Sequence, residues 1–138
     1  HTIGYGGMEG NLAGSFVADC YNLIRFGPGG ELGGISYDFT EETRLWGTLT
    51  LSGCLIVGDD VLECELSGRV FGRATGYYLG APTDVEPTLI GLVMDVTWII
   101  TGGTGGLGRV ICGRIKMERD EPFSPEPMTI TGQVLLQN

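Results

Sequence analysis

Two glutamates and two tyrosines are the side chains in this sequence best suited to acid–base chemistry or to hydrogen bonding with a substrate. Glu63 and Glu65 stand two residues apart and Arg69 continues the same alternation, so on a strand these side chains share one face. A buried carboxylate can act as a general acid or base, and the hydroxyls of Tyr21 and Tyr37 can donate hydrogen bonds. The candidate catalytic residues are therefore Tyr21, Tyr37, Glu63 and Glu65.

Each of these candidates also has an ordinary structural interpretation. If the glutamate face points inward, a cavity acquires an acid and a cation. If it points outward, Glu63 and Glu65 are solvated and form a cross-strand pair with an arginine. A slip of one residue in the strand assignment exchanges the two faces, so the sequence leaves both open. Tyr21 and Tyr37 have the alternative of capping the ends of the fold with their hydroxyls in water.

Large apolar side chains supply candidates for the wall of a site that binds a hydrophobic small molecule. They are Trp46, Tyr77, Tyr78, Met94 and Trp98. Trp46, Met94 and Trp98 have the alternative of ordinary packing in the core or in an interface. Tyr77 and Tyr78 adjoin the loop at residues 80–87, which is either a lid over the site or a plain surface loop.

The glycine-rich stretch "GGTGGLG" raises the question of a nucleotide site. Gly103, Gly105 and Gly108 satisfy the GxGxxG spacing of dinucleotide-binding loops. That motif must open a helix, whose N-terminus binds the phosphates. The residues that follow, "RVICGRIKMER", alternate and are β-branched, which predicts a strand. We therefore interpret the segment as a corner between strands and expect no nucleotide cofactor.

Charge and composition exclude several further classes of function. The 138 residues carry 17 acidic and 8 basic side chains, a net charge of −9, and no local stripe of Lys and Arg. Such a surface repels the phosphate backbone of nucleic acids. No apolar run approaches the length of a membrane span, and no signal peptide is visible. The sequence predicts a cytoplasmic protein with neither a nucleic-acid partner nor a membrane span.

The cysteines and the histidine do not form a recognisable metal site. Cys20, Cys54, Cys64 and Cys112 stand singly, without a CxxC pair, and His1 is the only histidine. We expect reduced thiols that pack as small apolar groups, although the sequence does not exclude disulfides. No metal and no other cofactor is predicted.

Alternating apolar residues separated by turn signals indicate an all-β fold in one domain spanning residues 1–138. The expected architecture is an antiparallel barrel of eight strands with a central apolar cavity, because closure removes exposed edges and this size leaves room for one ligand. A two-sheet sandwich is the alternative. The expected strands are 11–24, 35–39, 44–57, 61–71, 75–79, 88–100, 110–119 and 128–136.

The expected strand at residues 88–100 carries apolar side chains at both sets of alternating positions. Val93 and Ile99 belong to one set, and Leu92, Val96 and Ile100 to the other. A barrel strand facing water should have a polar outer face, so a second subunit is the simplest cover for it. The sequence predicts a homo-oligomer, most simply a homodimer.

The segment "TWIITGGTGGLGRVICGRI" resembles the "ITGGTGxFxGAxG" signature of the allene oxide cyclase-like and dirigent-like proteins. "WGTLTLSG" and "LECELSGRV" resemble the strands that precede this signature, so the similarity spans about residues 35–119. Where the family has an aromatic residue and then Gly-Ala, this chain has Leu107, Gly108 and Arg109. The acidic motif of plant dirigent proteins is absent, which argues against lignan coupling.

The resemblance implies a calycin-type barrel that controls how a reactive apolar molecule cyclises. Bacterial relatives of this barrel catalyse Diels–Alder-type ring closures in polyketide and other natural product pathways. The implied function is a cofactor-independent cyclase or isomerase of a polyene or polyketide-type intermediate, which holds its substrate in a reactive fold and polarises a carbonyl. A lipocalin-like carrier and a structural barrel with a filled interior are the alternatives.

Overall fold

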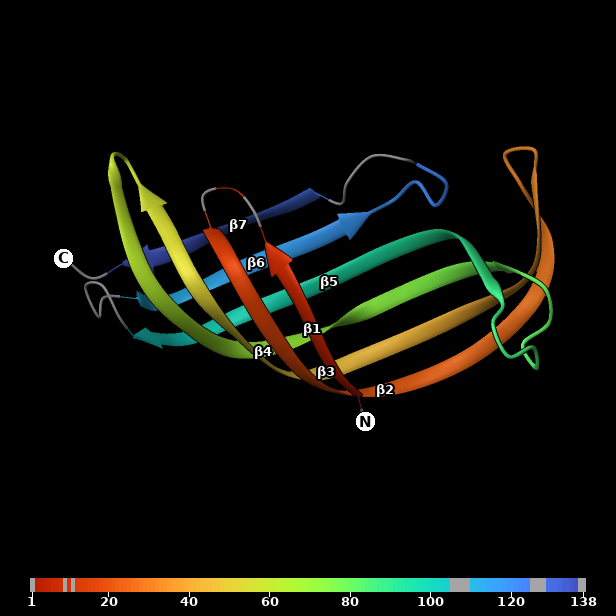
Figure 1. Ribbon diagram of the computed structural model, residues 1–138, viewed down its shortest axis with the longest axis horizontal. Helices are drawn as coiled ribbons and strands as arrows, with labels where there is room; N and C mark the ends of the chain where they lie inside the picture. The colour runs from red at the N-terminus through yellow and green to blue at the C-terminus, as the bar shows by residue number, and fades with distance from the viewer. Residues whose placement is uncertain (1, 9, 11, 105–109, 125–128, 137–138) are drawn as a thin grey trace.

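The computed structural model describes residues 2–8, 10, 12–104, 110–124 and 129–136. These residues form one antiparallel sheet in which each strand pairs with its neighbours along the chain (Figure 1). The prediction of an all-β fold is confirmed. The strands are β1 (Thr2–Met8), β2 (Leu12–Leu32), β3 (Ile35–Val57), β4 (Asp60–Leu79), β5 (Thr88–Thr104), β6 (Val110–Arg119) and β7 (Thr129–Leu136).

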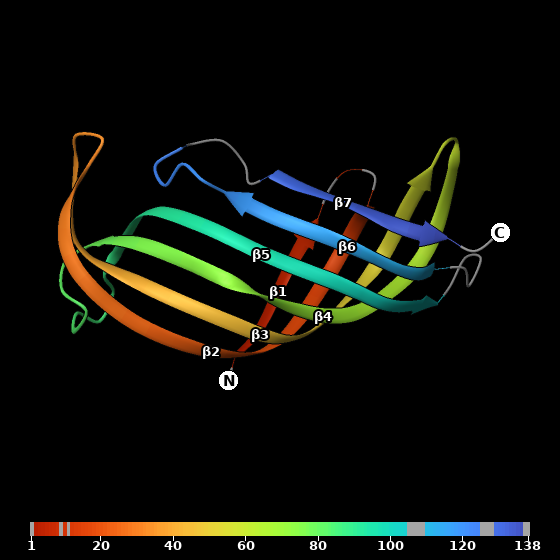
Figure 2. The same ribbon diagram turned by 180° about the vertical axis from the view of Figure 1, so that it is seen from behind.

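The sheet is strongly curved but, over the described residues, it does not close into the expected eight-stranded barrel (Figure 1, Figure 2). It has seven strands, with β1 at one edge and β7 at the other. The expected gaps between strands at residues 40–43 and 72–74 are absent. β3 and β4 instead pair in unbroken register from Phe39–Tyr78 to Val57–Asp60. β1 was not expected, since its glycine-rich sequence has little apolar alternation.

The core lies on one face of this sheet. Alternate residues of the central strands are buried there, and Leu51, Leu66, Trp98 and Ile100 are the most completely enclosed, at 2% exposure or less. Leu51 pairs with Leu66, so these side chains are direct neighbours across two strands. We call this the inner face, and the face with the intervening residues the outer face.

Glycine on the inner face permits neighbouring strands to approach closely. A Cβ atom at Gly47 would lie 2.1 Å from the carbonyl oxygen of Asp19, and one at Gly68 would lie 1.9 Å from that of Ile99. No side chain fits in either place, so these positions require glycine for the observed curvature.

The turn between β2 and β3 is shorter than the sequence suggests. Residues 25–34 lie between two of the expected strands, but β2 continues through most of them to Leu32. Only Gly33 and Gly34 form the turn, with φ angles of +59° and +80°. Two consecutive positive φ values are typical of the tight hairpin turns that match strand twist.

Candidate functional site

Aromatic side chains gather at the end of the sheet near the β2–β3 turn. Phe39 is 3% exposed, and its ring stacks on that of Tyr78 with centroids 4.8 Å apart and planes 4° apart. Phe26 contacts the edge of Phe39 at 6.0 Å. β2, β3 and β4 thus each contribute one ring to a packed group that stiffens this end of the sheet.

A second aromatic group connects the sheet to the segment after β6. Tyr37 of β3 and Tyr77 of β4 meet edge to face, with ring centroids 4.9 Å apart. Tyr77 also contacts Phe123, at 5.6 Å. Phe123 lies in the segment at residues 120–124, so this contact joins parts of the chain that are distant in sequence.

The segment at residues 120–124 is attached to the edge of β5. The backbone N–H of Leu92 donates a hydrogen bond to the carbonyl oxygen of Pro122, at 2.8 Å. Gly91 makes the approach possible, because a Cβ atom there would lie 2.6 Å from that oxygen and 2.7 Å from the Phe123 ring. The Arg119 guanidinium donates a hydrogen bond to the carbonyl oxygen of Ser124.

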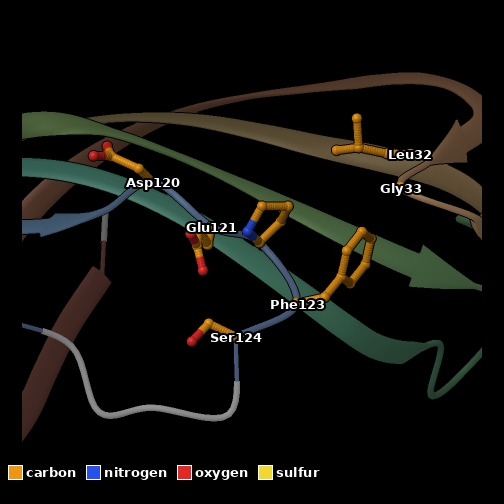
Figure 3. A pocket seen from close by; sticks show the side chains of 7 residues that line it. Leu32, Gly33, Asp120, Glu121, Phe123 and Ser124 are labelled. Carbon is orange, nitrogen blue, oxygen red and sulfur yellow. The ribbon is translucent and has the colours of Figure 1, made fainter.

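A surface hollow of about 910 Å³, which is widely open to solvent and which we call the cavity, lies between this segment and the β2–β3 turn. Figure 3 shows Leu32 and Gly33 on one side of it and Phe123 and Ser124 on the other. Its full lining is Leu32, Gly33, Asp120, Glu121, Pro122, Phe123 and Ser124. Apolar surface with a few polar groups at its margin is typical of sites for small molecules, and carboxylates at the margin can accept hydrogen bonds from a ligand.

The structure brings some of the predicted site residues to this end of the sheet. Tyr77 contacts Phe123 of the cavity and Tyr37 contacts Tyr77, but neither tyrosine lines the cavity, and Tyr78 belongs to the neighbouring Phe39 group. Burial and the adjacent carboxylate of Glu41 raise the pKa of Tyr78. A hydrogen bond between the Tyr78 hydroxyl and Glu41 also raises this pKa, so the hydroxyl is engaged within the protein and is not a free donor for a substrate.

The loop after Tyr78, predicted as a lid or a surface loop, is tied to β3 at its start. The Gly80 N–H donates a hydrogen bond to the Asp38 carboxylate at 2.7 Å. The Asp84 carboxylate accepts another from the N–H of Ala81, also at 2.7 Å. These bonds shape the loop as a local turn.

Met94 and Trp98 lie on the inner face, away from the cavity. Trp98 is 2% exposed at the centre of the core, and Met94 packs against the same cluster. The indole N–H of Trp98 is buried, and no hydrogen-bond acceptor for it is found in the described part of the chain. An unpaired buried donor lowers stability and marks a point where a polar ligand atom would gain a hydrogen bond.

The remaining predicted site residues lie on the outer face. Tyr21 and Trp46 are 56% and 49% exposed, and their rings stack with centroids 6.3 Å apart. Glu63 and Glu65 are exposed as well. The structure therefore does not bring these four residues together with Met94, Trp98 or the cavity.

Phe123 and the two carboxylates beside it were missed by sequence reasoning. They lie in "DEPFSP", which was interpreted only as a proline-rich loop. The available signal was Phe123 itself, an aromatic residue between prolines in an otherwise polar segment.

Comparison with family models, with curated proteins and with solved structures finds no match for this chain. Over the described residues, no group of three or more His, Cys, Asp or Glu side chains could hold a metal ion. The same part of the chain contains no helix with the length and apolar character that a membrane crossing requires.

The four cysteines are free thiols in different environments. Burial raises the pKa of Cys20, as does the nearby Asp19 carboxylate, whereas Cys112 is exposed. We expect N-ethylmaleimide at about pH 8 to modify Cys112 at least about ten times faster than Cys20, because the thiolate is the reactive form. Peptide mass spectrometry over a time course measures both rates. Equal rates in the native protein would contradict the prediction, and equal rates in denaturant are the control.

Proposed function

We propose that the protein binds a small, largely apolar molecule in the cavity between the β2–β3 turn and residues 120–124, and that it directs ring closure of this molecule without a cofactor. The observation that carries the proposal is the cavity of about 910 Å³ with Leu32 and Phe123 on opposite sides. Apolar side chains stand beside polar groups in this open hollow, a combination that sites for small molecules use.

The chemistry of this proposal requires orientation more than reactive groups. Confinement of a flexible polyene between Leu32 and the Phe123 ring would favour the folded conformation from which a ring closes. Ser124 lines the cavity, and its hydroxyl can donate a hydrogen bond to a substrate carbonyl. The resemblance of the glycine-rich segment to the cyclase signature favours a Diels–Alder-type reaction of a polyketide-like intermediate.

A carrier of a hydrophobic ligand is the second candidate, because the same cavity would serve it. The cyclase and the carrier differ in turnover. A linear polyene that carries both reacting partners of a Diels–Alder reaction is incubated with and without protein, and the cyclised product is followed by liquid chromatography. Acceleration over the spontaneous rate supports the cyclase, whereas binding without acceleration supports the carrier.

Association into a homodimer remains part of this proposal. In the described residues β1 and β7 each have one unpaired edge, and closure or association would cover them. Multi-angle light scattering tests the dimer, and a mass equal to the 14.7 kDa chain would refute it.

Phe123→Ala is expected to weaken binding of a neutral polyene, with retinol as the probe, by about ten-fold, because an aromatic wall of the cavity is lost. Retinol fluorescence in a titration measures the Kd. Val85→Ala is the matched control, since Val85 is 99% exposed in the loop before β5. Equal Kd values for the Phe123 variant and the wild type would refute the cavity as the binding site.

A further inference from the structure

The outer face carries a pair of arginines whose charge is not compensated. Arg44 of β3 and Arg73 of β4 are direct partners in the register, and both are exposed. Like charges directly opposite each other destabilise a sheet. In the part of the chain that the structure describes, no carboxylate forms an ion pair with either of them. The sheet therefore bears an unfavourable contact that its own packing does not explain.

The neighbouring carboxylates are engaged with other cations. Glu42 forms an ion pair with Arg25, at 2.9 Å. Asp95, the register partner of Arg73 on β5, lies 3.7 Å from the ammonium of Lys116. Lys116 is held more closely by Glu118, at 2.6 Å. Among the described residues, Arg44 and Arg73 therefore have no ion pair, although Glu42 and Asp95 stand in the same hollow.

These groups surround a hollow rather than a flat surface. Its volume is about 470 Å³, and its lining is Arg25, Glu42, Thr43, Arg44, Arg73, Ala74, Thr75, Val93 and Asp95. The guanidinium of an arginine binds a carboxylate through two parallel N–H donors, and the Thr75 hydroxyl adds a donor at the same place.

An exposed aromatic surface adjoins the hollow. Trp46 and Phe71 are direct register partners, each two residues from one of the arginines, on the same outer face. They are 49% and 45% exposed, and Tyr21, at 56%, stacks on Trp46. Three large rings side by side in water are unusual for a surface without a partner.

We propose that Arg44, Arg73, Trp46 and Phe71 form a second binding site, for a small anion with a planar apolar body, such as an aromatic carboxylate. The carboxylate lies between the two guanidinium groups, and the ring system covers Trp46 and Phe71. This site is on the face opposite the core and does not depend on the function proposed for the cavity.

Calorimetric titration with naphthalene-2-carboxylate tests the site, and naphthalene-2-carboxamide is the uncharged ligand of the same shape. We expect the carboxylate to bind the wild type at least about ten times more tightly than the amide, because only the carboxylate forms charge-assisted hydrogen bonds with the guanidinium groups. Arg44→Gln and Arg73→Gln should each remove this preference. Trp46→Ala should weaken the binding of both ligands.

Arg114→Gln is the matched control, because Arg114 is an exposed arginine opposite Ile99 of β5, outside the hollow. The proposal predicts that it keeps the preference for the carboxylate. Residual binding of the amide shows that each arginine variant is folded. No saturable binding of the carboxylate to the wild type, or an equal loss in the Arg114 variant, would overturn the proposal.

Discussion

Replacement of Trp98 by alanine is expected to lower the free energy of unfolding by about 3–5 kcal/mol, the usual cost of a large-to-small substitution in a core. Trp98 is 2% exposed, and its register partners Val70 and Ile115 are buried on the same inner face. Strands paired in a continuous ladder cannot move together to fill the space, so a cavity remains.

The chain contains its own control for this prediction. Trp46 is the other tryptophan, and its 49% exposure on the outer face predicts a cost below about 1 kcal/mol for Trp46→Ala. Urea denaturation of the variants measures both values. Equal costs would show that the inner face is not the core of the folded protein.

A phenylalanine at position 98 separates packing from the unpaired indole N–H. Trp98→Phe keeps most of the ring and removes a donor that has no acceptor in the described residues. Burial of an unpaired donor costs about 1–3 kcal/mol, so relief of this cost should offset part of the lost volume. Trp98→Phe should therefore be clearly less damaging than Trp98→Ala in the same urea titration.

Gly68→Ala is expected to destabilise the protein by about 1–3 kcal/mol or more, although one methyl group is the whole change. The new Cβ would lie 1.9 Å from the carbonyl oxygen of Ile99 and 2.8 Å from its carbon. These atoms belong to a paired strand, so relief of the clash requires β4 and β5 to separate.

Gly102→Ala should instead raise the free energy of unfolding. Gly102 is on β5, and a Cβ atom there would meet no atom within 4 Å. Without a clash, alanine restricts the unfolded chain and stabilises by about 0.4–1 kcal/mol. The difference in urea midpoint between the two variants is the measurement. If Gly68→Ala also stabilised the protein, the close approach of β4 and β5 at this point would be wrong.

The strand pattern was predictable because it depends on local sequence. Alternation over residues 110–119 and 128–136 predicts β6 and β7 almost to the residue. The long strands were divided wrongly, since the polar residues 41–43, "EET", were interpreted as a turn. They instead continue the ladder to β4, where Glu41 pairs with Gly76. A polar residue is compatible with a strand wherever its partner and its face tolerate it.

The candidate site was less predictable because it joins distant segments. Tyr77 was selected for its chemistry, but its contact with Phe123 depends on the segment after β6 returning to the edge of β5. That return requires the absence of a side chain at Gly91. No local pattern in "DEPFSP" contains this information.

The sequence by itself determined the class of fold and which residues share a face, because both follow from the two-residue period of a strand. Only the tertiary structure decided which face is inside. Curvature of the sheet turned Trp98 inward and left Trp46, Glu63 and Glu65 outside. Neighbouring strands approach most closely in this curved sheet at positions such as Gly47 and Gly68, where no side chain fits. The tertiary structure also placed Arg44 beside Arg73, a juxtaposition that arises from register between strands and not from any motif.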